Sequence, residues 1–408
     1  MHNLLHKFGD AARSFSFRRY GNVALNLIER RLRVTRPWSY PLLLDIVLTK
    51  ACNLNCTFCI SSTVETSRWL DFHRYERIAR RLFPYARNVS FCSGGEPLLY
   101  SHVRDALRLA NRHRVKTLMV SNGMLLEDEV CRWMTADQSL RNYYLSFDGS
   151  TRETVERIRR GASFDRIVEN VTNLHRHKTD ARVALPRLGI RYSVMKQNVA
   201  ELPGVCKLAK SMGASSVVVS FVNFANEMDV QDSLYREQDL AAEVFAETRA
   251  RAAEHGITVE LPPLPRDDGD PRRCVEPWRF VQIDTDGTVR FCYRAWVQTM
   301  GRFDEGFGRV WRGEQYANVR ATLDGQSPYF PYCQFCSECR GTNNEAAHDQ
   351  RLHAAAYSFD RAEPQLEFNN RGEENRLAFK ARRQELAAEL PEQPPAVDEP
   401  LEEELPVR

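Results

Sequence analysis

Three cysteines on one short loop are the residues of this chain most suited to chemistry. The sequence LTKACNLNCTFC places Cys52, Cys56 and Cys59 directly after a predicted strand. Three thiolates at this spacing can bind three irons of a [4Fe–4S] cluster and leave the fourth iron open, as a catalytic metal keeps a free position. The alternatives are a zinc knuckle or a redox CxxC pair. A closed zinc site needs a fourth ligand nearby, and the first histidine downstream is His73.

A second group of cysteines lies far along the chain. Its members are Cys274, Cys292, Cys333, Cys336 and Cys339. The first two flank an Asp-Gly dipeptide at 286–287, which predicts a β-hairpin between them. In a reducing compartment, cysteines clustered in this way are more often metal ligands than disulfides. We therefore expect a second metal site, which is either an iron–sulfur cluster or structural zinc. Cys131 and Cys206 stand apart on predicted amphipathic helices, where we expect them in the core.

The elements that must position the first cysteine loop alternate between strand-like and helix-like segments. Six strand candidates lie at 42–48, 88–92, 116–121, 142–147, 187–195 and 215–221, and amphipathic segments follow most of them. This alternation predicts a parallel sheet with helices outside it. Six such units indicate an α/β fold, an open or partial (β/α)6 barrel whose chemistry lies at the C-terminal ends of its strands.

Glycines and polar residues lie at the C-terminal ends of these strands, which the predicted topology brings to one end of the barrel. The residues concerned are Gly94, Gly95 and Glu96 after the second strand, Ser121 and Asn122 after the third, Ser146, Asp148 and then Arg159 after the fourth, and Ser193 in the fifth. Glycine allows a backbone to approach a ligand closely. Each segment alone is most often a simple turn, but five of them in order at strand ends favour a shared binding site.

With CxxxCxxC after the first strand, the chain resembles the radical S-adenosylmethionine (SAM) superfamily over about residues 40 to 345. The resemblance implies that Cys52, Cys56 and Cys59 hold a [4Fe–4S] cluster whose open iron binds SAM. It implies that the Gly94–Glu96 segment holds the methionine amino group, and that Arg159 pairs with the SAM carboxylate through its guanidinium fork. The other expected SAM-binding residues are Phe58 against the adenine, Ser121, Asn122, Ser146, Asp148 and Ser193.

The second cysteine group resembles the C-terminal SPASM and twitch extensions of that superfamily. The resemblance implies that Cys274, Cys292, Cys333 and Cys336 bind an auxiliary [4Fe–4S] cluster, with Cys339 as an alternative ligand. The full SPASM pattern carries more cysteines and commonly supports two auxiliary clusters. Five cysteines here therefore imply one.

Composition divides the chain into four segments. We expect a basic helical extension at 1–40, the radical SAM partial barrel at 41–262, the cysteine-rich α+β auxiliary-cluster domain at 274–345, and a disordered acidic tail at 360–408. In the extension, Val23, Leu25, Leu27 and Ile28 could line a face packed on the barrel. Alternatively, apolar and basic residues together could contact a membrane interface.

Charge and hydropathy exclude some classes of partner. A formal net charge of +3 gives no uniform basic field for nucleic acid. No segment is apolar for long enough to span a membrane, and charged residues interrupt any secretory signal, so we expect a cytoplasmic protein. A one-electron donor such as flavodoxin or ferredoxin is the expected partner.

The resemblance implies that the chain reductively cleaves SAM to a 5′-deoxyadenosyl radical, which abstracts a hydrogen atom from a substrate. The expected enzyme is a SPASM/twitch-type oxidoreductase that oxidises or rearranges a peptide or a small natural product or sugar. A radical epimerase, with Cys339 or Cys92 as hydrogen donor, is the alternative within the superfamily. A non-catalytic iron–sulfur or zinc-binding protein is the alternative outside it. Plausible substrate-facing residues are Tyr144, Arg191, Asn223, Asn226, Glu227, Tyr293 and Arg294; no catalytic residue is nominated.

Overall fold

The computed structural model describes residues 17–59, 69–222, 232, 234, 237–262, 264, 274–292 and 299–323. The expected tail, residues 1–16 and the distal cysteines Cys333, Cys336 and Cys339 lie outside the described residues.

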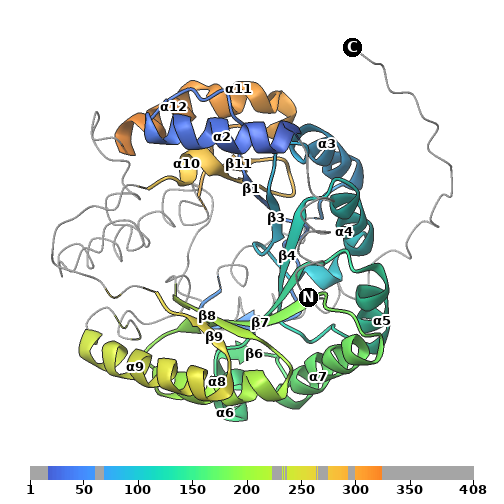
Figure 1. The fold of residues 1–408 in the computed structure, drawn as a ribbon, viewed down its shortest axis with the longest axis vertical. Coiled ribbons are helices and arrows are strands. Elements are labelled where there is room, and N and C mark those ends of the chain that lie inside the picture. Colours follow the sequence, from blue (N-terminus) through green and yellow to red (C-terminus); the bar gives the residue numbers. More distant parts are fainter. Residues whose placement is uncertain are drawn as a thin grey trace, which may run out of the picture. The chain divides into compact units, whose positions relative to one another are not determined.

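One curved sheet organises the described part of the chain (Figure 1). Its nine described strands run in the order β11-β10-β1-β3-β4-β5-β7-β8-β9. The six expected strands are β1 (Leu43–Ile46), β3 (Asn88–Phe91), β4 (Lys116–Ser121), β5 (Asn142–Ser146), β7 (Arg187–Val194) and β8 (Ser216–Phe221). Each pairs in parallel with the next in this order. The predicted partial barrel is therefore confirmed, and β9 (Thr258–Glu260) adds a further parallel strand beside β8.

The helices lie on the outer side of this sheet, as Figure 1 shows. They are α3 (Phe72–Leu82), α4 (Val103–Arg112), α5 (Asp128–Asp137), α6 (Arg152–Ile158), α7 (Phe164–Asp180), α8 (Leu202–Ser211) and α9 (Gln238–His255). Alternate strand residues such as Met119, Leu145 and Ile190 are buried against them. The residues between these, such as Val120 and Tyr144, are only half-buried, because they face the barrel interior. Cys131 and Cys206 are fully buried on α5 and α8, as expected.

The predicted hairpin forms between β10 (Phe280–Ile283) and β11 (Val289–Arg290). Its turn needs Gly287, which has a φ of +89° and donates its N–H to the Asp284 carbonyl at 2.9 Å. By its place in the sequence, this hairpin belongs to the expected cysteine-rich segment. In the structure, β10 pairs in parallel with β1 and extends the barrel sheet. Short helices α10 (Glu276–Arg279), α11 (Phe307–Arg312) and α12 (Glu314–Leu323) accompany it.

Helix α2 (Phe17–Arg31) precedes the barrel and differs from expectation in how it packs. Its buried residues are Arg19, Asn22, Asn26 and Glu29, whereas Leu25, Leu27 and Ile28 are exposed. The apolar face expected to pack on the barrel therefore points away from it. No helix in the described ranges has the length and apolar character that crossing a membrane requires.

Candidate functional site

A two-stranded ribbon fixes the cysteine loop in place. Strand β2 (Asn55–Cys56) pairs antiparallel with β6 (Arg159–Arg160), so that Cys56 lies opposite Arg159. The Thr57 N–H donates to the Ile158 carbonyl at 2.9 Å, and the Cys59 N–H donates to the Cys56 carbonyl at 3.2 Å. The sequence carried no signal for strands this short. The ribbon brings the predicted ligand loop and the predicted SAM-binding arginine together.

Polar donors approach two of the three sulfurs. The Asn122 amide nitrogen lies 3.9 Å from the Cys52 Sγ, and the Arg159 Nη1 lies 3.9 Å from the Cys56 Sγ. Burial raises the pKa of the Cys56 thiol to about 12, and the nearby Arg159 offsets this only in part. Cys56 would therefore remain a thiol on its own, whereas a coordinated metal deprotonates a thiol outright. Three reduced cysteines, two of them with N–H donors beside their sulfurs, fit an iron–sulfur cluster.

The spacing of the three cysteines can be compared with the needs of an iron–sulfur cluster and of a single metal ion. Within the described ranges, no three Cys, His, Asp or Glu side chains gather closely enough to hold one metal ion. Thiolates that each bind a different iron of a [4Fe–4S] cube do not need to converge on one point.

The glycine segment after β3 packs against the entrance of the cysteine loop. The Gly95 N–H donates to the Thr49 carbonyl at 2.7 Å, and the Glu96 N–H donates to the Ala51 carbonyl at 2.8 Å. A Cβ on Gly95 would lie 1.7 Å from the Ala51 oxygen, so no other residue fits there. Gly94 is also confined, because it has a φ of +89° and its added Cβ would lie 2.6 Å from the Thr49 oxygen.

Glu96 joins the ends of β3 and β4. One carboxylate oxygen accepts the Leu98 N–H at 3.1 Å and the other accepts the Asn122 N–H at 2.8 Å. Asn122 then donates its side-chain amide to the Asn53 side-chain oxygen at 2.8 Å, inside the cysteine loop. Burial raises the pKa of the Glu96 carboxyl above its ordinary value, despite these donors. Ser121 is buried beside it and accepts the Gly123 N–H.

Arg159 and Asp148 form a buried ion pair at the ends of β5 and β6. The Arg159 Nη2 lies 2.5 Å from the Asp148 carboxylate, and both side chains are less than a tenth exposed. Asp148 also accepts the Ser193 N–H at 2.7 Å, which ties the pair to β7. The Arg159 guanidinium lies over the Phe58 ring at 5.7 Å. The structure thus brings Phe58, Asp148, Arg159 and Ser193 together; Ser146 ends β5 nearby and is half-buried.

The barrel interior next to this site carries polar side chains from several strands. Asp45 on β1 accepts hydrogen bonds from the Gln282 side chain at 3.0 Å and from the Ser90 hydroxyl at 2.8 Å. Across the interior, the Arg191 guanidinium lies over the Tyr144 ring at 5.8 Å. The Arg191 Nε is buried and has no hydrogen-bond partner among the described residues. An unpaired buried donor at this position suits a polar or anionic group of a substrate.

Two of the five distal cysteines are described. Cys274 precedes α10, and its carbonyl accepts a hydrogen bond from the Arg33 Nη1 at 3.0 Å. Cys292 lies two residues after Arg290, the last residue of β11, whose carbonyl accepts a hydrogen bond from the Tyr316 hydroxyl at 3.3 Å. Both are half-buried, reduced cysteines. Cys333, Cys336 and Cys339 lie outside the described residues, as do the substrate-facing candidates Asn223, Asn226, Glu227, Tyr293 and Arg294.

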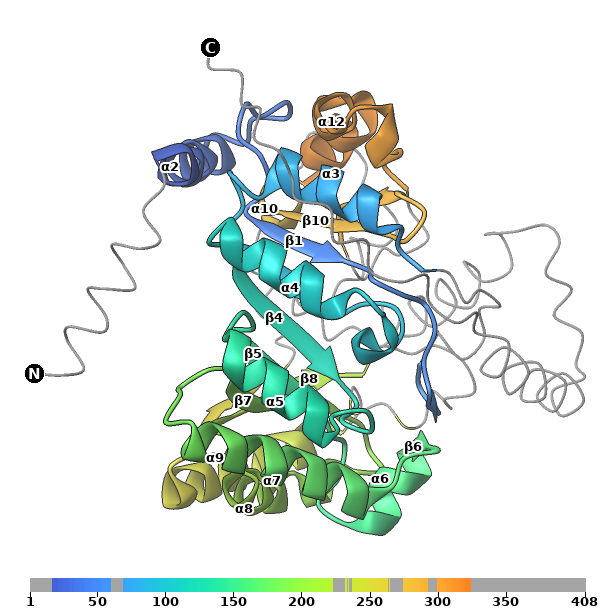
Figure 2. The same ribbon diagram turned by 90° about the vertical axis from the view of Figure 1, so that its right-hand side faces the viewer.

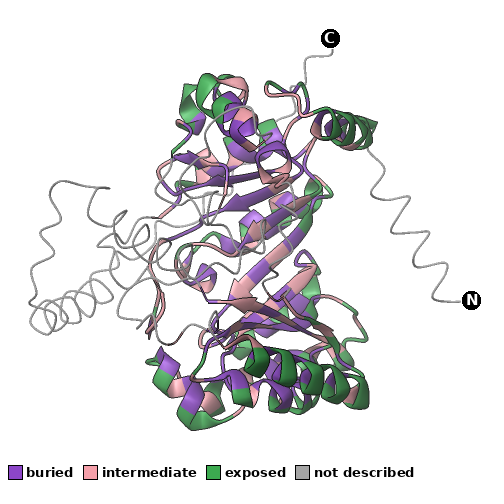
Figure 3. Cartoon of the chain, turned by 90° about the vertical axis from the view of Figure 1, so that its left-hand side faces the viewer, coloured by how far each residue is buried: buried purple, intermediate pink, exposed green. Residues whose placement is uncertain are grey.

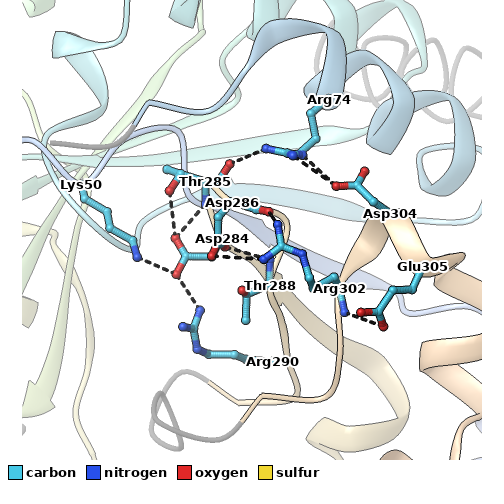
Figure 4. A network of polar contacts seen from close by, with 10 residues as sticks. All are labelled: Lys50, Arg74, Asp284, Thr285, Asp286, Thr288, Arg290, Arg302, Asp304 and Glu305. Atoms are coloured by element: carbon cyan, nitrogen blue, oxygen red, sulfur yellow. Dashed lines mark hydrogen bonds and ion pairs between the residues drawn. The ribbon is translucent and has the colours of Figure 1, made fainter. Parts of the chain in front are cut away.

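A buried carboxylate connects the two cysteine-bearing segments (Figure 4). Asp284, at the end of β10, lies 2.9 Å from the Lys50 Nζ and 2.8 Å from the Arg290 Nη1. Lys50 is two residues before Cys52, and Arg290 is two residues before Cys292. Burial alone would raise the pKa of the Asp284 carboxyl, but the two cations hold it below its ordinary value. Sequence reasoning missed this link, because its three residues are far apart in the chain.

The edge of the same network fixes the hairpin turn against α3. In Figure 4, Arg74 reaches the Thr285 carbonyl at 3.0 Å and the Asp304 carboxylate at 3.2 Å. Arg302 lies against Asp286 on the other side of the turn. These contacts hold the hairpin that carries Cys292 at a defined position beside β1.

Comparison with known proteins agrees with this geometry. The model of the radical SAM superfamily matches residues 46–209, and that of an iron–sulfur cluster-binding domain, SPASM, matches residues 274–340. A probable GTP 3′,8-cyclase of Methanocaldococcus jannaschii is 22% identical over 61% of this chain and 84% of its own length. A PqqA peptide cyclase of Gluconobacter oxydans is 24% identical over 63% of this chain and 71% of its own.

A solved structure shows the same fold. Streptococcus suis SuiB bound to precursor peptide SuiA superposes with a TM-score of 0.56 at 16% identity, covering 74% of this chain and 71% of SuiB.

Replacing Gly95 with alanine tests the close approach of the glycine segment to the cysteine loop. The added Cβ overlaps the Ala51 oxygen, so we expect the free energy of unfolding to fall by about 3 kcal/mol or more. The amount of iron bound per chain after anaerobic reconstitution should also fall. Gly21→Ala is the matched control, because nothing lies within 4 Å of its added Cβ, and it should stabilise α2 by about 0.5–1 kcal/mol. Equal stability of Gly95→Ala and wild type would contradict the packing described.

Replacing Asp284 with asparagine tests the link between the cysteine segments. The change leaves Lys50 and Arg290 close together without their shared carboxylate, so we expect a loss of about 2–4 kcal/mol in urea unfolding. Glu243→Gln, which removes an exposed carboxylate on α9, should change stability by less than about 0.5 kcal/mol. If both variants behave alike, the ion pairs of Asp284 do not hold the segments together.

Proposed function

Because this chain belongs to the radical SAM superfamily and carries an iron–sulfur cluster-binding SPASM domain, we propose that it is a SPASM-type oxidoreductase acting on a substrate inside its barrel. The observation that carries the proposal is the assembly of the cysteine loop, Glu96, Asn122 and the Arg159–Asp148 pair at one end of the strands. When bound there, the cluster and SAM supply an electron and a 5′-deoxyadenosyl radical that abstracts a hydrogen atom.

The proposed ligands of the first cluster are Cys52, Cys56 and Cys59. Around them, the chain's own groups would orient SAM. The buried Glu96 carboxylate is an acceptor for the ammonium group, and its position is fixed by two backbone donors. Gly94, Gly95, Ser121, Asn122 and Ser146 complete the proposed contacts at the strand ends.

Arg159 is the proposed partner of the SAM carboxylate. A guanidinium has five N–H donors, and the contacts with Asp148 and the Cys56 sulfur leave others available. The Arg159 Nε is buried and has no hydrogen-bond partner among the described residues. Asp148 neutralises the buried cation and orients it, and Phe58 provides an apolar surface for the adenine beside it.

The auxiliary cluster is proposed to bind Cys274, Cys292, Cys333 and Cys336, with Cys339 as the alternative. It would accept an electron from the substrate radical and so make the net reaction an oxidation. A flavodoxin or ferredoxin would supply the reducing electron to the first cluster. The expected location is the cytoplasm.

A peptide is the proposed substrate class. The relative named PqqA peptide cyclase and the SuiB complex with its precursor peptide support this choice. Arg191 and Tyr144 would bind an anionic group of the substrate, such as a side-chain carboxylate. A small natural product is the second candidate, supported by the relative named as a probable GTP 3′,8-cyclase.

Iron counting after anaerobic reconstitution, with a dithionite assay for 5′-deoxyadenosine, tests this function. We expect about eight irons in the wild type and about four, with no deoxyadenosine, in Cys52/Cys56/Cys59→Ala. Cys274/Cys292→Ala should also hold about four irons but should still cleave SAM. Cys206→Ala, at a buried cysteine on α8, is the control and should keep both properties. Zinc in place of iron, or wild-type protein that does not cleave SAM, would contradict the proposal.

Replacing Arg159 with lysine tests its proposed contact with SAM. Lysine keeps the charge near Asp148 but loses the planar fork, so we expect SAM to bind about tenfold more weakly. Equilibrium dialysis of the reconstituted protein with labelled SAM measures this affinity. Arg157→Lys, at a half-exposed side chain on α6, should leave it unchanged. Equal affinities in the two variants would assign Arg159 a structural role only.

A further inference from the structure

Helix α2 packs on the barrel with its polar side. Its buried residues Arg19, Asn22, Asn26 and Glu29 recur every three or four positions and so form one stripe. Arg19 donates to the carbonyls of His113 at 2.7 Å and Arg114 at 2.8 Å. Asn26 donates to the Trp278 carbonyl at 2.6 Å. A stripe of buried hydrogen-bonding side chains, rather than apolar burial, therefore attaches this helix.

These bonds place α2 at the end of the barrel opposite the candidate site. Arg114 precedes β4 and Trp278 precedes β10, so both carbonyls lie at the N-terminal ends of strands. Asn22 adds a bond at 3.0 Å to the carbonyl of Tyr40, which precedes β1. Figure 2 shows α2 on the side from which the arrows of β1 and β4 start. The outer face of α2 therefore points away from the barrel mouth.

The outer face of α2 and the turn after it are apolar. Of the eight large hydrophobic side chains that are exposed among the described residues, seven lie between Phe17 and Trp38. They are Phe17, Tyr20, Leu25, Leu27, Ile28, Leu32 and Trp38, of which Phe17 is 84% and Trp38 77% exposed. The eighth, Leu240, is isolated on α9. In Figure 3, the outer side of α2 is coloured as exposed. Single exposed hydrophobics are ordinary, but a contiguous patch marks an interaction site.

The exposed charged side chains within residues 17–38 are all positive. Arg18, Arg31 and Arg36 are exposed beside it. The only acidic residue in 17–38 is Glu29, which is buried and accepts the Trp38 and Ser39 N–H groups. A second copy of the same face would bring like charges together without any compensating carboxylate. The charge therefore favours a partner that is both apolar and anionic.

We propose that this face, defined as the exposed side chains of residues 17–38, docks on an anionic lipid surface. A single helix with Phe, Leu, Ile and Trp on its outer side and arginines beside them is suited to lie in the interface between headgroups and acyl chains. The bonds of the polar stripe hold the helix rigidly to the barrel. Docking would then direct the barrel mouth away from the bilayer, so that substrate and electron donor approach from solution.

Co-sedimentation of the full-length, reconstituted protein with vesicles tests the proposal. We expect binding to vesicles that contain phosphatidylglycerol and phosphatidylcholine, and much weaker binding to phosphatidylcholine alone. Leu27→Glu/Ile28→Glu should lower the partition coefficient at least about tenfold, because it puts two charges on the apolar face. Arg18/Arg31/Arg36→Gln should lower it about tenfold or more and remove its dependence on salt. Leu240→Glu is the control and should bind as the wild type does.

Each variant should still produce 5′-deoxyadenosine, which shows that the barrel is folded. Absence of wild-type binding to anionic vesicles, or equal binding by Leu27→Glu/Ile28→Glu and wild type, would overturn the proposal. A third result would also overturn it. If light scattering shows that the wild type is a dimer, that Leu27→Glu/Ile28→Glu is a monomer, and that neither binds vesicles, a second copy of the chain covers this face.

Discussion

The candidate site depends on one buried cation. Arg159 is almost fully removed from water, and a guanidinium in that position is stable only if negative partners and hydrogen-bond acceptors surround it. Asp148 provides the carboxylate, and the Cys56 sulfur lies on another side of the guanidinium. The β2–β6 ribbon brings Cys56 opposite Arg159, and the Ser193 N–H fixes Asp148 from β7. Burial of this charge therefore couples the cysteine loop to the ends of β5 and β7.

Close backbone contacts and a second buried charge extend this coupling. Gly94 and Gly95 let the segment after β3 lie directly on the cysteine loop, and Glu96 continues the connection to Asn122 after β4. On the other side, Asp284 joins Lys50 to Arg290. The residues just before Cys52 and just before Cys292 thus share one carboxylate.

The sequence predicted the parts of this architecture that have local signals. The six strands alternate with amphipathic segments, and Gly94, Asn122 and Asp148 each follow one, so topology alone placed them at one end of a barrel. Pairings between distant segments had no such signal. Strands β2 and β6 contain two residues each, and β10 pairs with β1 across more than two hundred residues. Hydrophobic periodicity showed that α2 is amphipathic. It could not show that the polar side would face the barrel, where Asn22 and Asn26 donate hydrogen bonds to backbone carbonyls.

The central claim is that the cysteine loop holds a cluster with an open iron that binds SAM directly. Electron–nuclear double resonance of the reduced protein tests it most directly, with SAM labelled by ¹⁵N in the amino group and ¹⁷O in the carboxylate. We expect hyperfine coupling of both labels to a [4Fe–4S] signal, in the wild type and in a protein that lacks Cys274 and Cys292. A reduced cluster that shows no coupling to either label would contradict it, because SAM would then bind elsewhere or not at all.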